Sequence, residues 1–410
     1  MKIKGILSIL ILLLLLQQAS AQKTKFDTLF TLKAKMGITH IDSVFLFYED
    51  SQGQAIFRSL PIFNDSFMIT DSISYPMKAH LMFKDIGEKL SESDIEKRSK
   101  EIYLEPGLLT LTGNPAKLSE LKLEGSESQL DLDELNRLTA PMRAGMQPLI
   151  DLYDKEKDPE KADLIQTKMK PYEDQIKAIC YQFFITHPNS YVTVCKLQDY
   201  ADELGPEASR HIYKNFNDYI KLSPEAKKLD IQLKKIESTM PGNMAANFTT
   251  TEMDGKSVSL TDFRGCYVLL DFWSTWHAPA RRGNTELIEL YKKYKDKGLQ
   301  IIGIADDDET AAAWKKAVAK DGIGLWPNVL SGANTPDDIN EKYSIHAVPT
   351  KVLIDPAGKI IARFGDSYSR PNVDMEQVLA SEFRKNDELL KKAEEAQARA
   401  AAQEVKDAQK

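Results

Sequence analysis

The stretch Asp271-Phe272-Trp273-Ser274-Thr275-Trp276-His277-Ala278-Pro279-Ala280-Arg281 decides the fold of the C-terminal third of this 410-residue chain. It overlaps a continuous apolar run, Tyr267 to Phe272, of the kind found in a buried strand. Pro279 stands where a helix can begin, and we predict a helix from about Pro279 to Lys295. A buried strand, a short turn and a helix start therefore follow one another.

Strand and helix patterns alternate on both sides of this segment. Such alternation predicts an α/β domain over residues 241–384, with a central sheet and crossover helices. The expected elements are a hairpin over 248–260 that turns at Asp254-Gly255, strands over 299–305, 351–354 and 359–364, and helices over 309–321 and 373–383.

The chain before residue 241 has two different patterns. Short runs rich in Phe, Ile, Val and Tyr predict a β-rich, sandwich-like domain over 22–126. These runs are 30–34, 44–48, 67–70, 79–83, 102–104 and 108–111. Residues 127–240 are helical in pattern, with Pro159, Pro206 and Pro224 at positions where helices can start. At the other end, residues 385–410 have little to bury, and we predict a charged tail, helical or disordered.

Residues 1–21 have the features of a secretory signal peptide. Two lysines precede an apolar run from Ile6 to Leu16, and Ala19-Ser20-Ala21 supplies small residues at cleavage spacing. The run is too short to span a bilayer. We therefore predict a mature protein that begins at Gln22, is periplasmic or secreted, and has no stable membrane anchor after cleavage. The formal net charge of −7 argues against nucleic acid as a partner.

Residues 244–383 resemble the exported thioredoxin-like oxidoreductases of the TlpA and ResA type. The blocks that carry the resemblance are Asp254-Gly255, 260–265, 270–273, Trp276 with Pro279, 303–307, 347–350 and 353–358. The resemblance implies a thioredoxin fold with Pro349 as a cis-proline that faces the active-site helix. A weaker resemblance, at Leu104-Glu105-Pro106-Gly107 and at 125–129, implies the β-rich and helical extension that precedes such modules.

The same resemblance shows what the motif lacks. His277 stands where the attacking cysteine would be and Ala280 where the resolving cysteine would be, so 277–280 is a degenerate motif. Thiol–disulfide exchange needs both sulfurs. Asp271 is retained at the buried-acid position, which in active relatives moves protons for the resolving thiol. Cys266 lies about 20 Å away along the strand and cannot substitute. We therefore predict no catalytic residue.

His277 could still serve another purpose. A helix N-terminus opposes a protonated imidazole, so we expect a neutral ring that can form hydrogen bonds. His277 and His346 together would give zinc only two of its usual three or four protein ligands, and we predict no metal and no cofactor. A recognition role that faces the Pro349 loop and a plain polar replacement both remain open.

Cys180 and Cys195 lie almost symmetrically about a turn at 187–190. Residues equidistant from the turn of a helical hairpin face each other, and an exported protein permits a disulfide. Two buried, free thiols are the alternative, because both cysteines lie among core-like residues.

Two functions remain for the whole chain. The first is an exported, redox-inactive thioredoxin-fold protein that acts as a binding or scaffolding module in the cell envelope. Its partner would be an unknown protein or peptide of the periplasm, held by Trp276, His277, Val348 and Pro349. The second is a thiol-disulfide oxidoreductase or peroxiredoxin-like enzyme of the TlpA/ResA type with an atypical site. The missing thiols favour the first.

Overall fold

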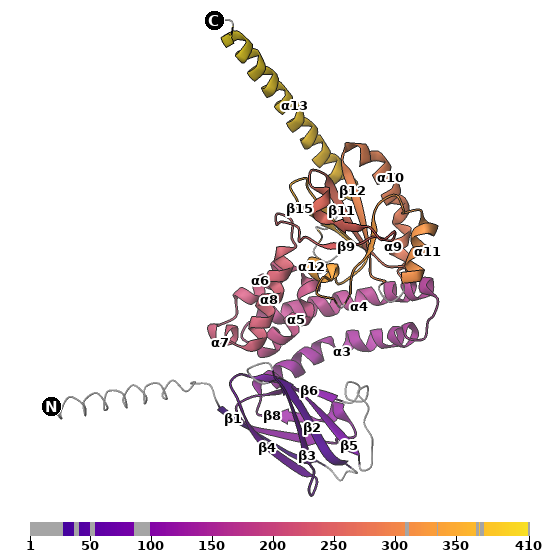
Figure 1. The fold of residues 1–410 in the computed structure, drawn as a ribbon. Coiled ribbons are helices and arrows are strands. Elements are labelled where there is room, and N and C mark those ends of the chain that lie inside the picture. The colour runs from indigo at the N-terminus through magenta and orange to yellow at the C-terminus, as the bar shows by residue number, and fades with distance from the viewer. Residues whose placement is uncertain are drawn as a thin grey trace, which may run out of the picture. The chain divides into compact units, whose positions relative to one another are not determined.

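The computed structural model describes residues 28–36, 41–49, 54–85, 99–307, 311–333, 335–365, 369 and 373–408 (Figure 1). The predicted signal peptide lies outside these residues. Contacts divide the chain into two units. The first contains residues up to 144 with 178–199 and 212–230, and the second contains 145–177, 200–211 and 231 onward. The helical segment is therefore shared between the units, and the predicted domain boundaries stay predictions.

Two four-stranded sheets form the β-rich part of the first unit. Their strand orders are β4-β1-β7-β8 and β3-β2-β5-β6. The bounds are β1 Thr28–Met36, β2 Ile41–Glu49, β3 Ala55–Pro61, β4 Ser66–Ile73, β5 Met77–Asp85, β6 Ser99–Leu104, β7 Gly107–Gly113 and β8 Lys122–Glu124. Leu32 of one sheet and Leu46 of the other belong to one buried cluster, so the sheets pack face to face. This confirms the sandwich-like expectation.

A carboxylate ties the turn after β6 to the start of helix α3. The Glu105 carboxylate accepts the backbone N–H groups of Glu127, at 3.0 Å, and Ser128, at 2.8 Å. Gly125 has a φ of +91°, and a Cβ there would lie 2.3 Å from the Leu108 carbonyl oxygen. The two short segments that carried the weaker resemblance thus form one structural junction.

Six helices follow in the segment predicted as helical. They are α3 Glu127–Tyr153, α4 Pro159–Thr186, α5 Tyr191–Leu204, α6 Pro206–Lys214, α7 Asp218–Lys221 and α8 Pro224–Ser238. The three helix starts predicted at prolines are confirmed. In the first unit, the Tyr191 ring of α5 meets Tyr103 of β6 edge to face at 6.3 Å, so α5 begins against that sheet.

A five-stranded sheet, ordered β13-β12-β11-β14-β15, forms the centre of the second unit. Strands β11, β12 and β13 are parallel, β14 runs antiparallel to β11, and β15 runs antiparallel to β14. The bounds are β11 Tyr267–Trp273, β12 Leu299–Ala305, β13 Asn328–Leu330, β14 Thr350–Ile354 and β15 Ile360–Phe364. Every residue of β11 is buried, which explains its continuous apolar pattern.

Helices cover both faces of this sheet (Figure 1). Leu269 of β11 clusters with α10 Asn284–Tyr294, α11 Ala311–Asp321 and α13 Met375–Ala408. Leu270, pointing the other way, clusters with α12 Ile339–Tyr343 and Phe248. The alternation of β11 side chains therefore builds two cores, one on each face. Within the ranges given above, no helix has the length and apolarity that crossing a membrane requires.

The structure corrects one predicted helix and extends another. The single helix expected from Pro279 to Lys295 is wrong, because it is two helices, α9 Ala278–Arg282 and α10, that meet at Gly283. Glycine is a poor helix former and permits this break. The predicted tail is helical, since α13 continues without interruption from the domain to Ala408. Strands β3, β8 and β13 and helix α12 were not predicted.

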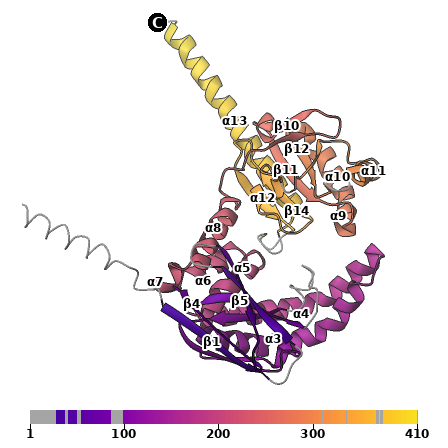
Figure 2. The ribbon, with the colours of Figure 1, turned by 60° about the horizontal axis from the view of Figure 1, so that its bottom comes forward.

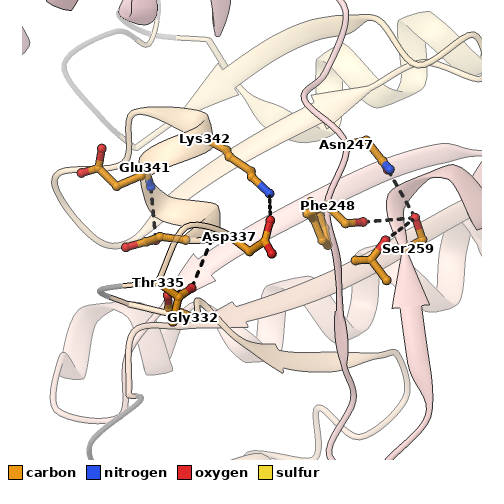
Figure 3. Close-up of polar contacts among 10 residues, drawn as sticks. Asn247, Phe248, Ser259, Gly332, Thr335, Asp337, Glu341 and Lys342 are labelled. Carbon is orange, nitrogen blue, oxygen red and sulfur yellow. Dashed lines mark hydrogen bonds and ion pairs between the residues drawn. The ribbon is translucent and has the colours of Figure 1, made fainter.

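Short polar contacts fix the opening hairpin and the loop before α12 (Figure 3). The hairpin consists of β9 Thr249–Thr251 and β10 Ser257–Ser259, as predicted. Ser259 Oγ lies 3.1 Å from the Phe248 carbonyl oxygen. In the loop, Lys342 Nζ lies 2.8 Å from Asp337 Oδ1, and Thr335 Oγ1 donates to the Gly332 carbonyl at 2.7 Å. These contacts fix each segment locally.

Candidate functional site

The degenerate motif lies at the carboxyl end of β11. Strand register places Phe272 opposite Thr350, so the residues after Trp273 and those before Thr350 meet at the same edge of the sheet. The Val348-Pro349 peptide bond is cis, as the resemblance implied. The structure thus brings the motif and the Val348-Pro349 loop together, as the binding prediction requires.

Asp307 anchors the loop that precedes the motif. Its carboxylate accepts the Thr275 N–H at 2.8 Å and the Thr275 hydroxyl at 2.6 Å, and its side chain is buried. Asp307 follows β12, the strand beside β11, so the sheet holds the loop from the neighbouring strand. Sequence reasoning quoted Asp307 for the resemblance alone and missed this role, because no local pattern shows which loop it meets.

His277 is the N-cap of α9. Its Nδ1 accepts the Ala280 backbone N–H at 3.3 Å, which satisfies one of the free donors of the helix start. Burial lowers the pKa of His277; the carboxylate of Asp163 opposes this shift and Arg282 adds to it. The ring is therefore neutral at pH 7 with Nδ1 unprotonated, as predicted. In an active motif a cysteine would stand at this position. Here the imidazole stands there instead and caps the helix.

Ala280, the second degenerate position, lies on the buried side of α9. The next residue, Arg281, forms a two-point contact with Asp321 at the end of α11, through Nε at 2.9 Å and Nη2 at 2.5 Å. Burial would raise the pKa of Asp321, but the hydrogen bonds from Arg281 and Asn284 outweigh it and lower the pKa. Helix α9 is thus fixed by a charged pair on its far side and by His277 at its start.

Asp271 has a partner that sequence reasoning missed. The carboxylate is 2% exposed, and Lys351 Nζ lies 3.0 Å from its Oδ1. Lys351 stands directly opposite Asp271 in the antiparallel pairing of β11 with β14. The lysine side chain is itself only 15% exposed. The buried acid, predicted to have no thiol to serve, is therefore held by a buried ammonium group.

Trp276 is the exposed side chain of the motif. It is 60% exposed, and its ring meets the His277 imidazole edge to face at 5.8 Å. Val348, in contrast, packs partly against the core of the second face. A side chain this exposed does not pack beneath the Val348-Pro349 loop. The side chain presents a large apolar surface with one hydrogen-bond donor.

The two histidines proposed as weak metal ligands have separate partners. His346 Nε2 lies 3.3 Å from Asp202 Oδ2, whereas His277 caps α9. Among the residues that the structure describes, no group of three or more His, Cys, Asp or Glu side chains is arranged to hold a metal ion.

All three cysteines lie outside the motif, and none of them is part of a disulfide. Cys180 and Cys195 are buried in the first unit, and no disulfide joins them. Burial raises the pKa of the Cys195 thiol to about 12, so its thiolate is scarce at neutral pH. Cys266 is partly exposed just before β11, at the opposite end of that strand from the motif.

Comparisons with known proteins match the second unit. A model of the AhpC/TSA family matches residues 241–363. The thiol-disulfide oxidoreductase ResA of Bacillus thuringiensis subsp. konkukian is 38% identical over 140 residues, which cover 34% of this chain and 78% of that protein. ResA of Bacillus subtilis is 30% identical over 125 residues, covering 30% and 67%. The solved thioredoxin domain of a thiol-disulfide oxidoreductase from Bacteroides vulgatus is 38% identical, covering 31% of this chain and 91% of that one, with a TM-score of 0.29.

Proposed function

We infer that this chain, which belongs to the thioredoxin-like family of the TlpA/ResA type, is a redox-inactive member that binds an extended peptide segment outside the cytoplasm. One observation carries the proposal. The side chain at the attacking-cysteine position, His277, caps α9 through Nδ1, while Trp276 beside it stays exposed. The His277 cap stabilises the start of α9 without a sulfur atom, and the neighbouring Trp276 side chain remains accessible to a partner.

The chemistry of disulfide exchange supports the inactive half of the proposal. Exchange requires a thiolate that attacks a disulfide and a second thiol that resolves the mixed disulfide. His277 and Ala280 provide neither. Cys266 is partly exposed but stands a strand length away, about 20 Å. The Asp271 carboxylate, which would serve a resolving thiol as proton carrier, is engaged by Lys351 instead.

The retained surface supports the binding half. Active relatives hold extended segments beside the cis-proline, and the cis Val348-Pro349 bond is present at the same sheet edge as the motif. Trp276 adds an exposed aromatic anchor, the residue type that most often dominates a binding surface. The Trp276 ring already contacts the His277 imidazole. This contact reduces the side-chain rotamer entropy that binding would cost.

The location outside the cytoplasm rests on the N-terminal sequence. The basic start, the apolar run over 6–16 and the small residues at 19–21 support export and cleavage before Gln22. We therefore propose that this protein binds its peptide or protein partner in the cell envelope.

Trp276 also provides the readout for a binding experiment. The other three tryptophans, Trp273, Trp314 and Trp326, are buried, so acrylamide quenching of the mature protein reports mainly on Trp276. The probe is S-carboxymethylated insulin B chain, an extended peptide without free thiols. We expect the peptide to shield Trp276 from acrylamide, and Trp276→Ala to weaken binding at least tenfold by calorimetry.

A matched control distinguishes recognition at the motif from non-specific binding to exposed apolar side chains. Leu325 is 50% exposed and precedes β13, an edge strand that β12 separates from β11. Leu325→Ala should leave peptide binding unchanged, and both variants should melt at the wild-type temperature. Equal peptide affinity for wild type and Trp276→Ala, or no peptide binding at all, would contradict the proposed function.

A further inference from the structure

One side of the β-sandwich in the first unit is exposed. In the sheet β4-β1-β7-β8, side chains such as Leu32 and Leu109 point into the buried cluster between the two sheets. The alternate side chains point away from that cluster, because successive residues of a strand face opposite sides. We call this side the outer face. Its strands β1 and β4 lie side by side in both ribbon views (Figure 1, Figure 2).

The second sheet of the sandwich, in contrast, is covered by a helix on its outward side. Its residues Tyr103 and Glu101 meet α5, through the ring of Tyr191 and through Lys196 Nζ, which lies 2.9 Å from Glu101 Oε1. These four side chains are buried or half-buried. On the outer face of β4-β1-β7-β8, most outward side chains are exposed. That face is therefore available to a partner.

Large apolar side chains gather on the outer face. Leu29 of β1, Met68 of β4 and Leu108 of β7 are each more than half exposed. Phe63, in the turn that leads into β4, is 71% exposed and pairs with Ser66 at the edge of the same sheet. Phe63, Ser66 and Met68 line one hollow. Exposed apolar side chains that share one face mark an interaction surface.

The outer face is also basic. Lys33 and Lys35 extend outward from β1 and line the same hollow. Lys35 lies beside Thr112 of β7, which pairs with Lys122 of β8. None of these three lysines forms an ion pair with another residue that the structure describes. Glu124 is the one carboxylate among the outward residues of the four strands, although the whole chain has a formal net charge of −7.

We propose that the outer face binds reversibly to the surface of a lipid bilayer that carries anionic headgroups. The exposed apolar side chains enter the interfacial layer, and the lysine ammonium groups reach the lipid phosphates while their alkyl chains lie along apolar surface. Lysine is depleted where two proteins meet, so three unpaired lysines among these apolar side chains fit a membrane better than a protein partner. The proposal does not require peptide binding at Trp276.

The lysines determine the strength and the salt dependence of this binding. Each lysine close to an anionic membrane surface strengthens binding by about fivefold, so three lysines strengthen it on the order of a hundredfold. The carboxylate of Glu124 reduces this gain. Salt screens charges on an exposed surface, and binding therefore weakens as the ionic strength rises.

Flotation of the mature protein with large unilamellar vesicles tests the proposal. One vesicle sample is phosphatidylcholine alone, and the other contains equal parts of phosphatidylcholine and phosphatidylglycerol. At about 0.1 M NaCl we expect the partition coefficient to be at least tenfold higher for the anionic vesicles, and at about 0.5 M most of that difference should be lost. No binding to either sample, or equal binding to both, would overturn the proposal.

Two pairs of matched variants locate the contact. Lys35→Glu should lower the partition coefficient on anionic vesicles at least tenfold, whereas Lys227→Glu, the same change at an exposed lysine of α8, should alter it less than twofold. Leu108→Ser should lower it severalfold, whereas Leu222→Ser, at a leucine of similar exposure after α7, should not. Equal effects within either pair, in variants that circular dichroism shows to be folded, would exclude the outer face as the site.

A second copy of the chain is the alternative occupant of the outer face. We expect wild type and Leu108→Ser to have the same sedimentation coefficient in the absence of vesicles. A dimer that the wild type forms and Leu108→Ser does not form would overturn the proposal, because another copy would then cover the face.

Discussion

At the scale of single residues, His277 is a structural replacement for a reactive group. Its Nδ1 caps α9, so His277→Ala should lower the free energy of unfolding by about 0.5–1 kcal/mol. His277→Ser, which restores a capping oxygen, should recover most of the loss. Chemical denaturation at pH 7.5 measures both. A His277→Ala protein as stable as the wild type would show that the cap contributes nothing.

The same residue makes stability depend on pH. The pKa of His277 is lowered from its ordinary 6.5, first by burial, so the unfolded chain binds a proton more readily than the folded one. Its contribution is complete above pH 6.5 and is lost as the pH falls below that value through the lowered pKa. Wild type should therefore lose stability relative to His277→Ser as the pH falls from 7.5 to 5. A constant difference over this range would contradict the assignment of a neutral cap.

Asp271 and Lys351 form the second residue-level test. Asp271→Ala would leave the ammonium group of Lys351 with little water and no counter-charge, and should destabilise the protein by about 3–5 kcal/mol. The double variant Asp271→Leu with Lys351→Met removes both charges and should be more stable than Asp271→Ala alone. A double-mutant cycle by thermal denaturation measures the coupling. Additive effects of the two single changes would show that the pair does not interact.

Individual residues were predictable where the signal is local. A neutral His277 was expected from its place at a helix start, whereas burial, the first cause of its lowered pKa, could not be seen in the sequence. The Lys351 partner of Asp271 and the Asp307 anchor of Thr275 come from other strands. They depend on strand register, which one sequence does not specify.

At the scale of elements, Glu105 gives the junction between β6 and α3 its stability. It accepts two N–H groups at the start of α3, and charge-assisted bonds at a helix start are favourable. Glu105→Ala should cost about 1–2 kcal/mol of unfolding free energy, and Glu105→Gln, which keeps one acceptor, should cost less. Denaturant titration followed by far-UV circular dichroism checks this. A Glu105→Gln protein as stable as the wild type would mean that the side chain acts only by packing.

Elements were predictable in proportion to the strength of their boundary signals. The prolines that open α4, α6 and α8 marked helix starts correctly, and β11 was evident because both of its faces are buried. Strand β3 was missed because most of its side chains are exposed and it lacks an apolar pattern. The break between α9 and α10 was missed because a single glycine inside a helical pattern is often tolerated.

At the scale of the whole molecule, the chain joins a β-sandwich unit to a unit with a thioredoxin-type sheet. The order of strand and helix patterns predicted both architectures. The sharing of residues 127–240 between the two units was not predicted, because helix periodicity shows that a face is buried but not against which neighbour.

We propose that this member of a thiol-disulfide oxidoreductase family performs no disulfide exchange. The most direct measurement is dithiol-dependent reduction of insulin by the purified mature protein, with the variants Cys266→Ser and His277→Cys/Ala280→Cys measured beside it. We expect wild type and Cys266→Ser to stay at the background rate, because neither has a thiol at the start of α9. The double-cysteine variant should rise above background. Turnover by the wild type that persists in Cys266→Ser would contradict the account.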